Sequence, residues 1–395
     1  MIVPVWLPAL LGFLTAVGSI SIDMYLPAFP EIARELGQVR GGAQITLATF
    51  FIGLALGQLI LGPLADRVGR KVPLVVGMSL YTLATVGCAL STGLVSFSIF
   101  RFLAALGGAS SMVVPRAVVR DLANGPSAAR MMAQLMLVMG VSPILAPALG
   151  GVVLDWAGWR AIFWVQAVYG IINLTLVIFC LPDTLPPDLR IRHGLISVMQ
   201  RYAQVARDRN FLPAALTVAF TSATLFAYLG GSPLVFETGF RVSPVLYGCI
   251  FGLNGFGLIL ASQLNGRVFA TRFGIDRTLN AAVLVMLAGT VYLSVIAVFG
   301  LAGLVPVLIG LFIIIGSLGC VFPNGTVAVM SRQHANAGVA SALTGTLQFS
   351  IGAVSGMLVG ELSDSSPRAM ALCMLAGAAC VTFFNRLRPR AVPGA

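Results

Sequence analysis

Residues 57–71 read GQLILGPLADRVGRK and pass from an apolar run into a short charged segment. One long apolar run, near 43–65, leads into this segment, and another, near 72–92, follows it. Each run is about twenty residues long, the length that a helix needs to cross the hydrocarbon core of a membrane. Two membrane-spanning helices joined by a short basic loop are therefore predicted here.

The rest of the 395-residue sequence repeats this alternation of apolar runs and short polar loops. Hydrophobic residues make up 58% of it and charged residues only 9%, with a mean hydropathy of +0.97. Soluble domains carry about 25% charged residues, so an all-α polytopic membrane protein is predicted. We expect twelve spans, near 5–28, 43–65, 72–92, 95–117, 129–154, 161–181, 211–236, 244–268, 278–299, 302–330, 337–360 and 368–386.

The basic residues set the expected orientation and exclude other classes of function. Most of the 24 Lys and Arg residues fall in loops on the side of both termini, which predicts cytoplasmic termini. The net charge of +11 is spread between apolar runs rather than gathered in one patch, so nucleic-acid binding is not expected. The sequence carries no serine–histidine–acid set, metal-ligand cluster or P-loop. We therefore expect neither an enzyme nor a bound cofactor or metal.

An internal repeat divides the chain. The segment ADRVG at 65–69 returns as ATRFG at 270–274, and two further pairs of segments recur at nearly the same offset. Such repeats are typical of transporters built from two parallel halves. We predict two pseudo-symmetric six-helix bundles, 1–181 and 211–395, joined by a cytoplasmic linker, 182–210. The middle of that linker is either an amphipathic helix on the membrane surface or a plain solvated segment.

Asp23 is the one acid placed well inside an apolar run. A carboxylate there costs about 2.5–3.5 kcal/mol on insertion scales, which indicates a function. Pro27 and Pro30 interrupt the helix beside it, and such a carboxyl group can bind a proton and a cationic solute in turn. Arg101, in the fourth span, needs a partner, and Asp23 is the expected one. The alternatives are an Asp23 that only satisfies local backbone donors and an Arg101 that snorkels from the outer end of its span.

The charged segment resembles motif A of the major facilitator superfamily, GxLaDrxGrkxxl. That resemblance implies a latch that stabilises one access state. Asp66 would then face Asn336 near the eleventh span and either Arg116 or Arg120 of the fourth. The alternative is that the positive charges only hold the loop in the cytoplasm. The candidate latch residues are Gly57, Gly62, Asp66, Arg67, Gly69, Arg70 and Lys71.

The fifth span contains GVSPILAPALGG at 140–151, in which two prolines remove helix hydrogen bonds and small residues permit close packing. It resembles motif C of the drug/proton antiporters in the same superfamily, which implies export. The alternative is a proline-kinked packing helix without directional meaning. The candidate hinge residues are Gly140, Pro143, Pro147, Gly150 and Gly151.

Segments such as DMYLPAFP at 23–30 and FAYLGGSPLVFE at 226–237 resemble the Bcr/CflA drug-resistance branch of that superfamily. The resemblance implies proton-driven export of small drug-like molecules from the cytoplasm by alternating access. We expect the transporter to be a monomer in the bacterial inner membrane. The rival interpretations are a metabolite exporter, an importer and a receptor without transport. Candidate cavity residues, each of which could equally be an interhelical hydrogen-bonding group, are Tyr25, Phe226, Tyr228, Asn254, Gln263, Asn324 and Gln348.

Overall fold

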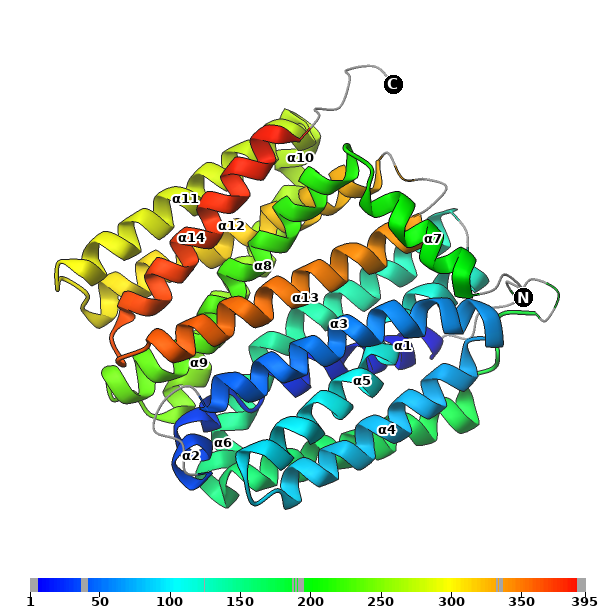
Figure 1. Cartoon of the computed structure of the whole chain (residues 1–395), viewed down its shortest axis with the longest axis horizontal. Coiled ribbons are helices and arrows are strands. Elements are labelled where there is room, and N and C mark those ends of the chain that lie inside the picture. The colour runs from blue at the N-terminus through cyan, green and yellow to red at the C-terminus, as the bar shows by residue number, and fades with distance from the viewer. Residues whose placement is uncertain are drawn as a thin grey trace. The chain divides into compact units, whose positions relative to one another are not determined.

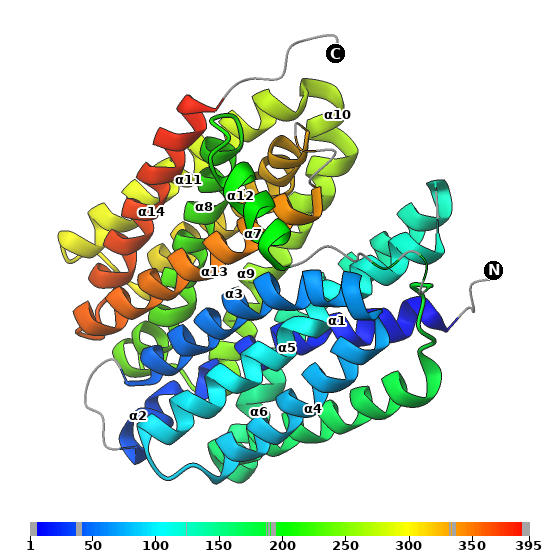
Figure 2. The same ribbon diagram turned by 45° about the vertical axis from the view of Figure 1, so that its right-hand side comes forward.

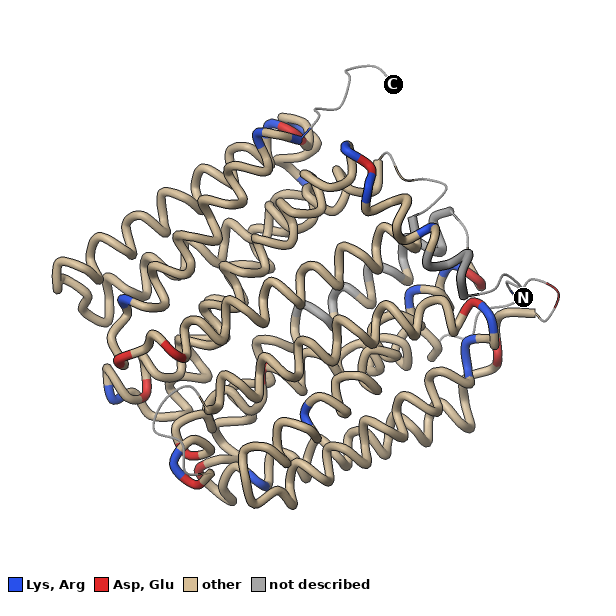
Figure 3. The backbone as a smooth tube through the Cα atoms, viewed as in Figure 1, with Lys and Arg blue, Asp and Glu red and all other residues tan. Residues whose placement is uncertain are grey.

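All regular secondary structure in the part of the chain that the structure describes is helical (Figure 1). The computed structural model describes residues 6–36, 42–123, 125–186, 188, 190, 195–331, 333 and 337–388. Eleven helices within these ranges are long and apolar enough to cross a membrane. Charged residues are found chiefly at helix ends and in loops, with long uncharged stretches between them (Figure 3).

The chain forms two compact units, and the first contains residues Met1–Val39, Thr49–Val198 and Pro244–Cys249. Helix α4 packs against α5 and α6, and α1 packs against α5 and α6; Figures 1 and 2 show α4 alongside α5. The elements in this part of the chain are α1 (Leu7–Asp23), η1 (Leu26–Ala28), α2 (Phe29–Glu35), α3 (Gly42–Val68), α4 (Lys71–Leu90), α5 (Leu94–Leu122) and α6 (Gly125–Cys180).

Helix α6 accounts for the fifth and sixth predicted spans together. It contains 56 residues, and its backbone leaves the helical region at Gly158 (φ 74°, ψ 174°). At a rise of about 1.5 Å per residue such a helix is about 84 Å long, whereas the hydrocarbon core is about 30 Å thick. Gly158 therefore separates two crossings, and the eleven long helices provide the twelve spans that the sequence predicts.

The first span is longer than predicted. Its helix stops at Asp23, continues through the short 3₁₀ turn η1 and resumes as α2, which ends at Glu35 rather than near residue 28. Pro27 and Pro30 stand in the opening turns of η1 and α2. Proline is tolerated there because its missing N–H is not needed by the helix. The two prolines thus begin new helical turns instead of ending the span.

The predicted linker contains a helix, α7 (Leu195–Ala206). Tyr202 and Val205 of α7 are buried, and Val205 belongs to an apolar cluster with Phe211 and Val218. The linker therefore contains a helix whose apolar side packs within the second unit, and this packing excludes a plain solvated segment. A position of this helix on the membrane surface stays a prediction. The predicted division at 181 and 211 stays a prediction.

The second unit contains residues Arg40–Ala48, Met199–Ser243 and Ile250–Ala395. Helix α8 packs against α13 and α14, and α11 packs against α12 and α14. The elements in this part of the chain are α8 (Phe211–Pro233), η3 (Leu234–Gly239), α9 (Pro244–Leu264), η4 (Asn265–Phe269), α10 (Ala270–Phe273), α11 (Ile275–Val298), α12 (Leu304–Met330), α13 (Ala337–Leu362) and α14 (Pro367–Leu387).

Candidate functional site

Asp23 is the last residue of α1 and lies directly before the interruption of the first span. Its side chain is buried in the first unit. Helix α6 comes so close to the interruption that a Cβ on Gly150 would collide with the carbonyl oxygen of Met24. Glycine is therefore required at that position, and it brings the motif C segment directly against the backbone next to Asp23.

Arg101 lies in the interior of the first unit, where its side chain is 1% exposed. Its Nη1 donates a hydrogen bond of 3.0 Å to the carbonyl oxygen of Ser21. The guanidinium carbon lies 4.1 Å from the ring centroid of Tyr25 and 4.0 Å from that of Phe50. Aromatic faces attract cations, most strongly where water is excluded. The charge is thus held by two rings and a backbone carbonyl.

The predicted ion pair between Arg101 and Asp23 is wrong, because neither takes part in any ion pair within the described ranges. The interrupted span turns the Ser21 carbonyl and the Tyr25 ring toward the guanidinium, and these replace a carboxylate. Snorkelling is also excluded by the burial of Arg101. Its Nε and Nη2 have no hydrogen-bond partner among the described residues. Buried donors without partners are rare and costly, so these two atoms are candidates for a transient partner.

The end of α1 is held by two neighbouring helices. The Ser21 hydroxyl shares a hydrogen bond of 2.8 Å with the Tyr81 hydroxyl of α4, and Gln166 Nε2 of α6 donates to the Ile20 carbonyl at 3.2 Å. The segment that carries Asp23 is thereby tied to α4, α5 and α6 by polar contacts.

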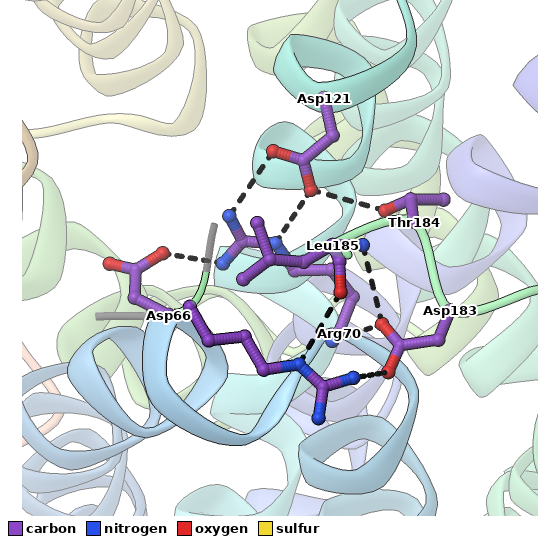
Figure 4. Close-up of polar contacts among 7 residues, drawn as sticks. Asp66, Arg70, Asp121, Asp183, Thr184 and Leu185 are labelled. Atoms are coloured by element: carbon purple, nitrogen blue, oxygen red, sulfur yellow. Dashed lines mark hydrogen bonds and ion pairs between the residues drawn. The ribbon is translucent and has the colours of Figure 1, made fainter. Parts of the chain in front are cut away.

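A second polar site, the Arg70 cluster, consists of Asp66, Arg70, Asp121 and Asp183 (Figure 4). The Arg70 guanidinium binds Asp121 through Nε at 2.7 Å and Nη2 at 3.2 Å, and Asp66 through Nη1 at 2.5 Å. Burial by itself lowers the pKa of Arg70, but its hydrogen bonds to Asp121 and Asp66 outweigh burial and raise the pKa above its ordinary value. Arg70 is therefore a permanent cation shared by two helix ends.

The segment that follows α6 completes this cluster. The Arg70 N–H donates to Asp183 Oδ1 at 2.8 Å, and Arg190 Nη2 binds Asp183 Oδ2 at 2.8 Å. Thr184 donates to Asp121 at 3.1 Å. Gly69 has a φ of 102°, and a Cβ there would collide with the Asp183 carboxylate. Gly69 thus serves both the reversal of the chain and the approach of Asp183.

The expected partners of Asp66 need correction. Asp66 pairs with Arg70 rather than with Arg116 or Arg120, because the left-handed turn at Gly69 directs the Arg70 side chain back onto the end of α3. The predicted contact with Asn336 lies outside the described residues.

The remaining latch residues contribute unequally. Lys71 Nζ donates to the Ile178 carbonyl at 2.6 Å, whereas Arg67 is exposed. A Cβ on Gly57 would lie 2.8 Å from the Leu106 carbonyl oxygen, so Gly57 permits close packing of α3 on α5. A Cβ on Gly62 would make only an ordinary contact of 3.7 Å.

The motif C segment remains helical. Helix α6 runs through Gly140, Pro143, Pro147 and Gly151, and its non-helical backbone angles are at Gly158. A hinge at the two prolines stays a prediction.

The candidate cavity residues of the second unit do not form one group. Asn254 Nδ2 donates to the Tyr228 hydroxyl at 3.2 Å, and Tyr228 stacks on Phe251 with centroids 5.3 Å apart. Asn324 is paired instead with Asn265, at 2.7 Å. The remaining candidates are spread out: Phe226 stacks on Phe349, Gln348 is half-buried and Gln263 is exposed, while Tyr25 belongs to the first unit.

A family model described as the Major Facilitator Superfamily matches residues 11–357. The chain belongs to the major facilitator superfamily. It is therefore a membrane transporter, with the multi-pass helical fold that the sequence predicts.

Several curated members of the superfamily resemble this chain along most of its length. An uncharacterised transporter of Bacillus subtilis, YdgK, is 33% identical over 96% of this chain and 95% of its own. A bicyclomycin resistance protein homologue of Haemophilus influenzae is 29% identical, over 94% of this chain and 92% of its own. A chloramphenicol resistance protein of Pseudomonas aeruginosa is 27% identical, over 78% of this chain and 73% of its own.

Solved structures show the same superfamily fold. The nucleoside transporter NupG matches with a TM-score of 0.73 at 12% identity, over 96% of this chain and 98% of its own. The Escherichia coli xylose transporter XylE, in a partially occluded inward-open conformation, matches with a TM-score of 0.72 at 14% identity. The match covers 97% of this chain and 96% of the XylE chain. At these identities the likeness concerns the fold alone.

In this superfamily member, Asp121 and Asp183 are the site residues that sequence reasoning missed. Asp121 lies in the last turn of α5 and Asp183 just after α6, and basic residues predominate near both in the sequence. An acid among basic residues at the end of an apolar run is the signal that could have found them, since it has cations within reach to pair with.

Proposed function

We propose that this transporter exports small drug-like molecules from the bacterial cytoplasm in exchange for protons. The observation that carries the proposal is a buried carboxyl group, Asp23, at the interruption of the first span. The names of two relatives, which refer to bicyclomycin and chloramphenicol resistance, support drugs as substrates. The motif C resemblance supports export, and the proposed activity is transport rather than catalysis.

The proposed coupling uses Asp23 and Arg101. Asp23 follows Ser21, whose carbonyl accepts from Arg101, by only two residues. Protonation of Asp23 removes a buried negative charge from the end of α1, two residues from the carbonyl that holds Arg101, which changes the balance of forces on the interrupted segment. Loss of the proton toward the cytoplasm restores the first state. The two Arg101 nitrogens that have no partner among the described residues are available to a polar solute.

The proposed location is the inner membrane, with both termini in the cytoplasm. The excess of Lys and Arg on the side of the termini supports this orientation. The Arg70 cluster then lies at the cytoplasmic surface, where a latch would control the inward opening. This scheme needs only a monomer with two halves, a small-molecule substrate and protons.

The test is the accumulation of bicyclomycin, chloramphenicol and a sulfonamide in efflux-deficient cells. Cells that express the wild type should accumulate less of at least one compound. Asp23→Asn and an uncoupler should each abolish the difference, whereas the control Asp364→Asn, an exposed loop acid, should preserve it.

Two other outcomes would count against the proposal. If no compound's level falls in wild-type cells, a metabolite exporter takes the place of a drug exporter. If export persists in Asp23→Asn and under the uncoupler, proton coupling through Asp23 is wrong.

A further inference from the structure

The second unit contains an apolar cleft of about 550 Å³ between α9, α11 and α12, here called the α11 cleft. Small residues from all three helices line it, namely Ala261, Ala281, Ala282, Gly316 and Ser317. Helix α12 approaches α9 closely at Gly319, where a Cβ would collide with the Leu258 carbonyl oxygen. At Gly316 the nearest atom to such a Cβ is 3.9 Å away. The helices therefore separate within one turn, and short side chains leave the gap open.

The hydroxyl groups in the wall of the cleft are already engaged. Thr278 Oγ1 has two carbonyl acceptors for its single proton, those of Gly274, at 2.8 Å, and Phe269, at 3.1 Å. Ser317 Oγ donates to the Ile314 carbonyl at 2.6 Å. A ligand in the cleft consequently meets a surface that is almost entirely apolar.

Arg277 is the one charged residue in the lining, and it stands in the first turn of α11. The neighbouring acid, Asp276, is bound to Arg388 at 2.6 Å. Arg277 itself is exposed and takes part in no ion pair within the described residues. Val285 lines the cleft about 12 Å further along α11, as its eight-residue separation implies. The cleft thus has a cationic end at a helix start and an apolar wall that extends into the span.

We propose that the α11 cleft binds an anionic phospholipid, with the phosphate on Arg277 and an acyl chain along the small-residue wall. The lining faces outward from the unit, since Ala281 is exposed, Phe273 is 51% exposed and Val285 is 47% exposed. A free anion would use only the arginine, and an uncharged apolar solute would leave its charge without a partner. A lipid from the leaflet next to the basic loops satisfies both ends of the cleft. The choice of leaflet rests on the proposed orientation, but the binding does not depend on drug export.

The experiment uses the full chain reconstituted in phosphatidylcholine vesicles with a minor fraction of phosphatidylglycerol. Native mass spectrometry after mild solubilisation measures the ratio of the two lipids retained. The wild type should favour phosphatidylglycerol, and Arg277→Gln should lower the ratio about fivefold, the factor that corresponds to about 1 kcal/mol per basic residue at a membrane surface. Arg277→Lys should keep most of the preference. Ala281→Phe, which fills the cleft, should reduce the retention of both lipids.

Two matched variants separate the cleft from the general surface. Arg386 is also exposed and lies at the end of α14, away from the cleft lining, so Arg386→Gln should behave as the wild type. Leu284 is 57% exposed on α11 and absent from the lining. Leu284→Phe is therefore the control for Ala281→Phe.

Three results would overturn the lipid proposal. The first is equal retention of both lipids by the wild type, and the second is a loss in Arg386→Gln as large as in Arg277→Gln. Displacement of the lipid by inorganic phosphate or by a transported drug is the third, since it would assign the cleft to a simple anion or to the solute. None of these readouts requires transport, so a negative drug-accumulation assay leaves this test intact.

Discussion

The backbone N–H of Arg70 donates a 2.8 Å hydrogen bond to Asp183, a residue 113 positions further along the chain. This contact joins the turn between α3 and α4 to the segment that leaves α6. It is possible because Gly69 has no side chain to fill the space that the carboxylate occupies. The turn and the start of the linker therefore form one structural unit, and a change at either should be felt at the other.

Gly69→Ala should destabilise the protein more than Gly274→Ala. Both glycines have positive φ values, 102° and 81°, and a backbone in such a sparsely populated region costs an alanine about 1–3 kcal/mol. Only at Gly69 does the added Cβ also collide with a neighbour, whereas nothing lies within 4 Å at Gly274. Thermal unfolding in detergent measures the difference. Equal losses in the two variants would mean that the Asp183 contact contributes nothing to stability.

Arg70→Lys should lower stability although it keeps the charge. A lysine cannot make the paired contacts with Asp121, and a hydrogen bond to a charged group contributes about 1.5–3 kcal/mol. The exposed Arg67 provides the control, Arg67→Lys, which should be neutral. Thermal unfolding reports the loss, and drug accumulation reports whether the latch controls transport. A neutral Arg70→Lys would contradict the bidentate geometry.

Arg101→Met should keep the fold while it impairs proton-coupled export. Replacement of a buried charge by an apolar side chain of similar volume is often neutral or stabilising. Methionine can occupy the space between Tyr25 and Phe50, but it cannot bond the Ser21 carbonyl or offer donors to a partner. The paired measurements are thermal unfolding and export under an imposed proton gradient. Full export by this variant would remove Arg101 from the coupling scheme.

Gly150→Ala should be much more damaging than Gly62→Ala, although both glycines belong to the recognised motifs. A Cβ on Gly150 collides with the Met24 carbonyl oxygen, while one on Gly62 makes an ordinary contact of 3.7 Å. The first change forces α6 away from the interruption beside Asp23, so we expect loss of both stability and export. Purification yield, thermal unfolding and drug accumulation test this. Comparable behaviour of the two variants would show that α6 adapts without cost.

The sequence by itself determined the spans and the family. Long apolar runs must become helices in a membrane, because each backbone group needs a hydrogen-bond partner there. The predicted run at 72–92 corresponds to α4 (Lys71–Leu90) for this reason. Gly158 breaks the helical backbone between two predicted spans, and Pro27 and Pro30 start helical turns instead of ending the first span. These details depend on backbone angles that hydropathy does not encode.

Only the tertiary structure decided the partners of the charged residues. Asp23 and Arg101 stood out in the sequence because charges within apolar runs are costly, yet Arg101 is held by Ser21, Tyr25 and Phe50 rather than by Asp23. Asp183 meets Arg70 only through the packing of α3, α4 and α6. Hydropathy registers whether a residue lies in a membrane-spanning segment, because insertion depends on the transfer free energies of that segment's own side chains. Which group the residue meets depends on how separate helices pack, and that information is spread over the whole chain.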